Sequence, residues 1–171
     1  MRTLVVGCNH RSAPVEIREC IAFDQAGVVR ALNMFRESFP SSECVLLSTC
    51  NRMEIYVARP ITGQPRITET IEFIARCHDL QPSTFTSGLY SKEDTEAARH
   101  LFRVVSSLDS MVVGETQILG QVKNAFELAQ SAGTVGSRLN DLFQRAFRVA
   151  KGVQSTGITA GRLSVGSAAV D

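Results

Sequence analysis

The chain has 171 residues, of which 44% are hydrophobic and 20% charged, and its formal net charge is +1. This length suits one domain with a hydrophobic core of ordinary size. The near-neutral charge argues against a protein that coats nucleic acid through bulk electrostatics, although it allows a local basic patch. No apolar run reaches the roughly 20 residues of a membrane helix, and the first residues are too few for a signal peptide. We therefore expect a cytoplasmic protein with no membrane contact.

The first half of the chain alternates short strands with helices. We expect a buried strand over 3–8, a short helix that begins at Pro14, and a second helix capped by Asp24. Strands over 45–48 and 53–58 follow on either side of a tight corner, and then a helix over 67–78 and a weak strand over 85–90. This order predicts a ferredoxin-like α+β fold, a four-stranded antiparallel sheet with helices on one face.

The second half is predicted to form additional C-terminal helices. Ser91 is expected to cap the first of them, and two more are expected over 116–130 and 137–154. The last helix has a long apolar stripe, which we expect to pack on the preceding helices. Several basic residues near the end of the chain are explained most simply as a solvated helix face: Arg138, Arg145, Arg148, Lys151 and Arg162.

Cys50 lies at the corner between two predicted strands. Arg52 is two residues away, and Thr49 and Asn51 add polar groups, conditions that favour a reactive thiolate. Taken alone, these residues also allow a buried cysteine at the end of a strand. The other cysteines have simpler explanations as core or helix residues, and no spacing indicates a disulfide framework, so free thiols are expected: Cys8, Cys20, Cys44 and Cys77.

Other kinds of site find little support. No pair of histidines or cysteines has metal-ligand spacing, so we expect no metal, and no glycine-rich loop follows a strand, so we expect no dinucleotide site in this chain. His100 lies beside an apolar stripe, where a half-buried structural histidine is the usual interpretation. A polar group around a predicted helix start is explained by capping: Ser110, Glu115, Thr116, Gln117 and Gln121.

Three blocks together resemble glutamyl-tRNA reductase, an oxidoreductase of tetrapyrrole (porphyrin) biosynthesis. They are residues 7–14 with 18–19, residues 47–56, and residues 107–123 apart from position 116. The resemblance implies that Cys50 is the catalytic nucleophile and that His100 is functionally important. It also implies a substrate pocket made of Thr49, Asn51, Arg52, Ser110, Glu115, Thr116, Gln117 and Gln121.

The resemblance further implies a reaction. The Cys50 thiolate would attack glutamyl-tRNA and form a glutamyl thioester, which NADPH would reduce to glutamate-1-semialdehyde. Arg52 suits a clamp on the side-chain carboxylate of the substrate, which would reject glutamine. His100 would either help to deprotonate Cys50 or orient the end of the tRNA.

The resemblance also implies a division of the chain. We expect residues 1–155 to form the catalytic domain and residues 156–171 to be a linker toward an NADPH-binding domain that is missing here, together with a dimerisation domain. Such a fragment should form the thioester and show only weak esterase activity. The full-length enzyme is expected to be a homodimer, with a downstream aminomutase and regulatory proteins as further partners. The alternative is a non-catalytic module that binds the tRNA end or a regulator.

Overall fold

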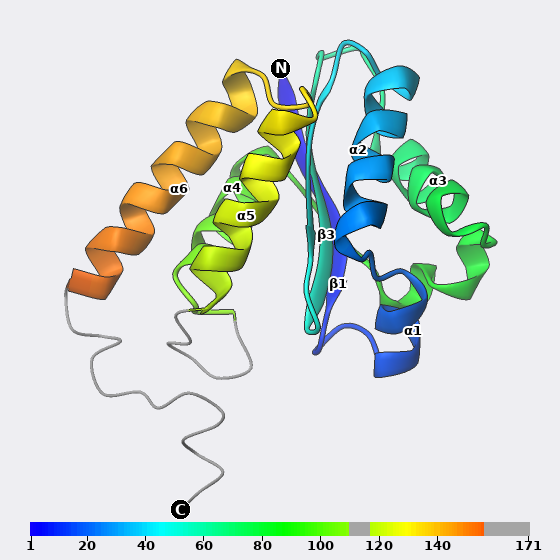
Figure 1. Cartoon of the computed structure of the whole chain (residues 1–171), viewed down its shortest axis with the longest axis horizontal. Coiled ribbons are helices and arrows are strands. Elements are labelled where there is room, and N and C mark those ends of the chain that lie inside the picture. The colour runs from blue at the N-terminus through cyan, green and yellow to red at the C-terminus, as the bar shows by residue number, and fades with distance from the viewer. Residues whose placement is uncertain (110–116, 156–171) are drawn as a thin grey trace, which may run out of the picture.

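The structure is a computed structural model that describes residues 1–109 and 117–155 (Figure 1). Its strands are β1 (Arg2–Asn9), β2 (Glu43–Ser48), β3 (Arg52–Arg59) and β4 (Tyr90–Glu93). Its α-helices are α1 (Val15–Cys20), α2 (Gln25–Ser38), α3 (Ile67–His78), α4 (Asp94–Val105), α5 (Gln117–Ser131) and α6 (Ser137–Ser155), and two short 3-10 helices are η1 (Pro82–Thr84) and η2 (Thr86–Gly88).

The four strands form one sheet in the order β2-β3-β1-β4, with every neighbouring pair antiparallel. This is the topology expected of a ferredoxin-like βαββαβ unit, so the predicted fold class is confirmed. Asp24 caps α2 as predicted, since its carboxylate accepts a hydrogen bond from the Gly27 amide at 2.6 Å.

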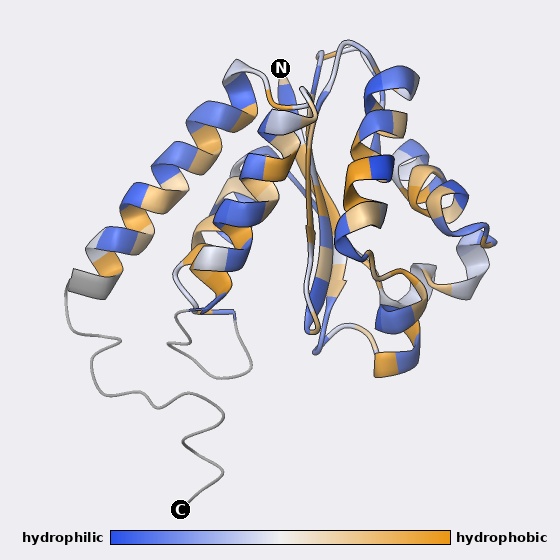
Figure 2. Cartoon of the chain, viewed as in Figure 1, coloured by the Kyte–Doolittle hydropathy of each residue, from blue (hydrophilic) through white to orange (hydrophobic). Residues whose placement is uncertain are grey.

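The two helices of the ferredoxin-like unit lie on one face of the sheet, as predicted, and the additional helices cover the other face, which the sequence did not indicate. Helices α2 and α3 lie on one face, whereas α4, α5 and α6 lie on the other (Figure 1). Every residue of β3 is consequently buried, those facing either way included. Figure 2 shows that α2 and α5 both turn hydrophobic residues toward the sheet between them.

Two local predictions between the sheet and α4 are wrong. The fourth strand begins at Tyr90, because η1 and η2 occupy the preceding segment and bury Phe85 completely. Ser91 lies inside β4 and caps nothing, since the strand pairs with β1 as far as Glu93 and α4 starts directly after it. Asp94 instead binds β1, accepting from the Thr3 amide at 3.1 Å.

Helix α6 packs on the preceding helices, as predicted from its apolar stripe. Phe143 stacks on Phe126 of α5, with ring centroids 5.2 Å apart, and meets the Tyr56 ring of β3 edge-on at 5.5 Å. The buried Glu43 carboxylate fixes the start of α6, where it accepts from the Arg138 amide at 3.1 Å and the Leu139 amide at 2.7 Å. A carboxylate at this position satisfies amides that have no partner within the helix and complements the helix dipole.

None of the described helices is long and apolar enough to cross a lipid bilayer. The predicted linker, residues 156–171, lies outside the described residues.

Candidate active site

A three-residue turn, 49–51, joins β2 to β3 and carries Cys50. The Thr49 hydroxyl oxygen accepts from the amides of Asn51 and Arg52, each at 3.2 Å, and the Thr49 amide donates to the Arg52 carbonyl at 2.8 Å. The residue that follows β1 supports the turn from the side, because the His10 amide donates to the Asn51 carbonyl at 3.0 Å. These bonds close the turn and leave Cys50 exposed.

Arg18 of α1 holds the nucleophile candidate from the other side. Its Nη1 donates to the Cys50 carbonyl oxygen at 2.6 Å, and its Nε donates to the Ala13 carbonyl at 3.3 Å. From the sequence, Arg52 was expected to supply the positive charge near Cys50. In the structure, the guanidinium that contacts the backbone of Cys50 is that of Arg18.

The five cysteines, all within the described part, differ in exposure, and only Cys50 is exposed. Cys8 and Cys44 are fully buried, and burial raises the pKa of both thiols. Burial also raises the pKa of Cys77, to about 12. Because the thiolate is the nucleophilic form, buried thiols of this kind are poor nucleophiles. All five cysteines are free, as predicted.

A buried ionic cluster begins two residues after Cys50. Glu54, which is completely buried, accepts from Arg52 Nη1 at 2.8 Å and from the Tyr56 hydroxyl at 2.6 Å. It also accepts a short hydrogen bond from the Tyr90 hydroxyl and lies 2.7 Å from His100 Nε2. We call these five residues the Glu54 cluster; they come from β3, β4 and α4.

The charge of Glu54 is maintained by its neighbours. Burial by itself would raise the pKa of this carboxyl, but the hydrogen bond from His100 and the charge of Arg52 outweigh burial and lower it to about 2. An ionised carboxylate only accepts, so His100 Nε2 must carry the hydrogen of their bond. Burial and the adjacent negative charge raise the pKa of Tyr56 and Tyr90, so both phenols remain donors.

Asp109 extends this cluster to the surface. It accepts from Arg52 Nη2 through its carbonyl and, at 3.3 Å, its carboxylate, and it also binds Asn9 Nδ2 at 3.3 Å and Arg11 Nη1 at 3.2 Å. His100, Tyr90, Asp109, Asn9, Arg11, Ser12 and Lys92 line a hollow of about 270 Å³ beside the cluster. A preorganised set of charged donors next to an open hollow can orient a small polar substrate.

The sequence matches one family of known proteins over most of its length. The family model described as the N-terminal domain of glutamyl-tRNA(Glu) reductase matches residues 6–157. The chain belongs to this family. It is 48% identical to the glutamyl-tRNA reductase of Magnetococcus marinus and 44% identical to that of Brevibacillus brevis, in each case over all of this chain and 41% or 38% of the relative.

A solved structure of glutamyl-tRNA reductase from Methanopyrus kandleri has the same fold. It superimposes with a TM-score of 0.80 at 38% sequence identity, covering 98% of this chain and 38% of that one. The chain thus spans about two fifths of the length of these glutamyl-tRNA reductases.

Several site residues that the family resemblance implied come together in the structure. Thr49 and Asn51 form the turn around Cys50, while Arg52 and His100 both bind Glu54. His100 is bonded to Glu54 and not to the Cys50 thiol. Arg52, predicted as a clamp for substrate, is only 2% exposed and already contacts two carboxylates.

The remaining predicted residues lie on or before α5. Gln117 begins the helix and is exposed, and Gln121 lines a cavity of about 160 Å³ together with Ser48 of β2. Ser110, Glu115 and Thr116 lie outside the described residues. In the described part of the chain, no group of three or more His, Cys, Asp or Glu side chains could hold a metal ion.

Sequence reasoning missed several residues that the structure adds to the site: Arg18, Glu54, Tyr90 and Asp109. A signal existed for Glu54, since a charged residue in the middle of an apolar strand needs a buried partner. For Asp109, which lies 57 positions from Arg52 in the sequence, no local pattern indicated the contact.

Proposed function

We propose that this chain is the thioester-forming part of a glutamyl-tRNA reductase and that Cys50 is its nucleophile. The observation that carries the proposal is the exposed thiol on a hydrogen-bonded turn, two residues before a buried cluster of charged groups. A nucleophile needs access to its substrate and a fixed position, and the turn provides both.

The proposed step is an acyl transfer. The Cys50 thiolate attacks the ester carbonyl of glutamyl-tRNA, so that a carbon–sulfur bond forms and the ester carbon–oxygen bond breaks. The electron pair of the broken bond leaves with the ribose oxygen of the tRNA, which takes up a proton. Arg18 fixes the backbone of Cys50 during this exchange through its 2.6 Å bond to the carbonyl oxygen.

Arg52 is proposed to recognise the side-chain carboxylate of the glutamyl group. Its guanidinium is held by Glu54 on one side and by Asp109 on the other. Of these two carboxylates, only that of Glu54 is completely buried, whereas that of Asp109 borders the hollow. We therefore infer that the substrate carboxylate takes the place of the Asp109 carboxylate. A glutaminyl group lacks the charge and could not replace the Asp109 carboxylate on this cation.

His100 is proposed to position Arg52 and not to act as the base for Cys50. Its Nε2 is engaged by Glu54, which in turn holds Arg52 Nη1. The hydrogen-bonded chain from His100 through Glu54 to Arg52 fixes the direction of the clamp.

The reduction that the family name implies requires a hydride donor, for which we propose NADPH. The described residues do not fit this cofactor. A dinucleotide site needs glycines at an open strand-to-helix turn, but Gly7 packs against the Met53 carbonyl inside the sheet and Gly88 against Ala13. We therefore propose that NADPH binds outside the described residues, with residues 1–155 as the catalytic domain and 156–171 as the linker to the NADPH domain.

Mass spectrometry of the chain after incubation with glutamyl-tRNA tests the nucleophile. We expect an adduct of glutamyl mass on Cys50, followed by slow release of glutamate to water. Cys50→Ser should carry no adduct, whereas Cys20→Ser, a matched change at a partly buried thiol of α1, should be acylated like the parent. Tight tRNA binding without any adduct would contradict the proposal and support the non-catalytic module.

A further inference from the structure

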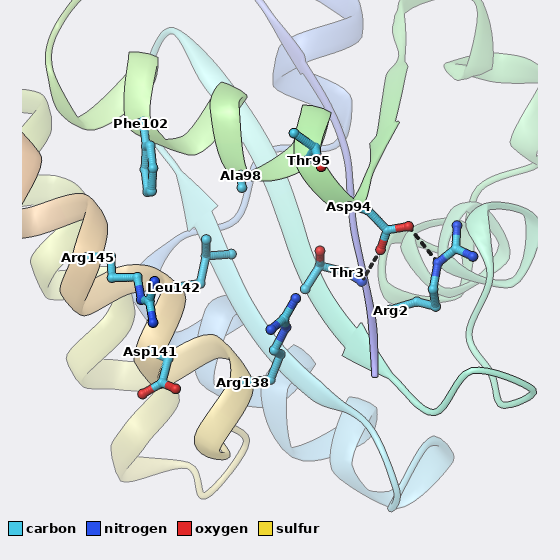
Figure 3. Close-up of a pocket in the computed structure, with 10 residues that line it drawn as sticks. All are labelled: Arg2, Thr3, Asp94, Thr95, Ala98, Phe102, Arg138, Asp141, Leu142 and Arg145. Carbon is cyan, nitrogen blue, oxygen red and sulfur yellow. Dashed lines mark hydrogen bonds and ion pairs between the residues drawn. The ribbon is translucent and has the colours of Figure 1, made fainter.

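A hollow lined by three arginines lies at the other end of the sheet from Cys50. It has a volume of about 460 Å³ and is bounded by the start of β1, by α4 and by the first turns of α6 (Figure 3). Arg2, on its rim, pairs in the sheet with Arg59, whereas Cys50 precedes the opposite end of the same strand. The two ends of β3, Arg52 and Arg59, are seven positions apart in the sequence, which is roughly 23 Å along a strand.

Three arginines border this hollow, and one of them is neutralised. Asp94 accepts from the Thr3 amide through Oδ1 and forms an ion pair with Arg2 Nε through Oδ2, at 2.6 Å. Both oxygens of this carboxylate are therefore occupied. The Arg2–Asp94 pair contributes no net charge to the hollow.

Arg138 and Arg145 supply the net positive charge. Both are exposed, and neither side chain forms an ion pair with a described residue; the same holds for Asp141, the remaining carboxylate in the lining. Two guanidiniums against one carboxylate leave an excess of one positive charge. Arg99, a neighbouring arginine on α4, differs because Glu96 pairs with it at 2.9 Å.

The position of Arg138 is built into the fold. The buried Glu43 carboxylate binds the backbone amides of Arg138 and Leu139, which anchors the first turn of α6 to β2. Figure 3 shows the Arg138 side chain reaching from α6 toward Thr3, in the middle of the hollow. The exposed Thr95 hydroxyl and an apolar wall that includes Phe102 complete the lining.

Further basic residues follow Arg138 and Arg145 along α6, toward the Cys50 end of the sheet. Helix α6 runs in that direction (Figure 1), and Arg148 and Lys151 are exposed further along it. Arg138 and Lys151 are 13 residues apart, which is roughly 20 Å along a helix. Positive charges distributed over this length of helix match an extended polyanion better than a single small anion.

We propose that this hollow, through Arg138 and Arg145, binds a backbone phosphate of the tRNA whose aminoacylated end reaches Cys50. The proposal rests on the proposed function, which supplies the tRNA. Guanidinium groups match phosphate oxygens in a bidentate geometry, and the hydroxyl of Thr95 adds a donor. Because a phosphate contact carries no sequence information, this surface sets the affinity and orientation of the tRNA and not its identity.

Filter binding of tRNA to the 171-residue chain over a range of salt concentrations tests the proposal. Arg138→Ala with Arg145→Ala should weaken binding about tenfold or more and reduce the slope of log K against log salt by about one to two units. Arg30→Ala, at an exposed arginine of α2 on the other face of the sheet, is the matched control and should leave affinity and slope unchanged. Thermal denaturation of each variant checks that the chain remains folded.

Two results would overturn this proposal while leaving the acyl transfer intact. In the first, glutamyl-tRNA acylates Cys50 and the double variant binds tRNA as the parent does, so that these arginines are only a solvated helix face. In the second, calorimetric titration with inorganic phosphate shows binding that the double variant abolishes, again with tRNA affinity unchanged, so that the hollow serves free phosphate. Absence of Cys50 acylation in the parent chain would instead contradict the proposed function itself.

Discussion

The two faces of strand β3 are both buried, yet they hold different kinds of side chain. Because Glu54 binds His100 of α4 and Tyr56 packs on Phe143 of α6, the alternating residues Met53, Ile55 and Val57 point to the opposite face, where they join an apolar core. Arg52, Glu54 and Tyr56 point to the face covered by α4 and α6, where they form an ionic cluster with His100 and Tyr90. One face therefore stabilises the fold by removing apolar surface from water, and the other depends on complete pairing of its charges.

This difference matters because the polar face begins beside the Cys50 turn. A buried cluster in which every group has a partner is rigid, and the loss of one partner leaves an uncompensated charge. Substitutions on the two faces should therefore separate stability from acyl transfer.

The largest effect is expected for Arg52→Met. The change leaves Glu54 and Asp109 without their shared cation. It should lower the unfolding free energy by about 3–5 kcal/mol, because it leaves an uncompensated charge in the protein interior. Urea denaturation measures this loss, and Cys50 acylation should fall below detection. Adding Glu54→Gln to Arg52→Met should recover part of the stability but none of the acylation; a double variant that is less stable than the single one would contradict the account.

Acid should weaken the polar face next. The pKa of Glu54 is about 2 in the folded chain, against an ordinary value of 4.5. Its contribution to stability is therefore complete above pH 4.5 and is lost as the pH falls toward 2, amounting to about 3 kcal/mol over that window. Urea denaturation from pH 6 to pH 2 should show this loss in the parent and in Glu37→Gln, an exposed control on α2, but not in Glu54→Gln.

A smaller effect is expected for Arg18→Ala. Loss of the charge-assisted bond to the Cys50 carbonyl should slow acylation about tenfold, which corresponds to about 1.4 kcal/mol, and should change stability little. Arg18→Lys, which retains a positive donor, should recover part of the rate. Single-turnover acylation at saturating glutamyl-tRNA measures the rate apart from binding, and an unchanged rate in the alanine variant would remove Arg18 from the site.

The smallest effect is expected for Ile55→Val on the apolar face. Removing one methylene from a fully buried isoleucine should cost about 1 kcal/mol of unfolding free energy. The acylation rate of the folded chain should remain that of the parent, because no member of the Glu54 cluster is touched. A tenfold slower rate would show that the two faces are coupled.

Most helices and strands could be predicted from local sequence patterns, and the wrong predictions have a common cause. Hydrophobic periodicity predicted α2, α3, α5 and α6 to within a residue or two over the described residues, because a helix that buries one stripe displays the period of 3.6. Strand β4 was placed too early and Ser91 was wrongly taken as a cap. Short edge strands and their ends depend on pairing with β1, which no local pattern records.

The candidate site divides in the same way. The turn around Cys50 was predicted from neighbouring residues and lies where expected, since its bonds span only three positions. The partners of Arg52 were not predicted: Glu54 is two residues away, but Asp109 comes from the segment after α4. His100 of α4 joins the cluster through Glu54. The sequence predicted Arg52 as an unpaired clamp for substrate, whereas in the structure it is buried and paired with two carboxylates.

The sequence alone determined the strand and helix order, the ferredoxin-like class, the position of the turn at Cys50 and, through three blocks of residues, the resemblance to the glutamyl-tRNA reductase family. All of these depend on short-range patterns along the chain. Packing of α4, α5 and α6 on the second face of the sheet decided that Glu54 is buried and charged and that Arg138 faces β1 across a hollow. The position of α1 beside the β2–β3 turn decided that Arg18 holds the backbone of Cys50. These features join residues 32 to more than 100 positions apart, and their energies depend on burial and on distances that exist only once the layers are assembled.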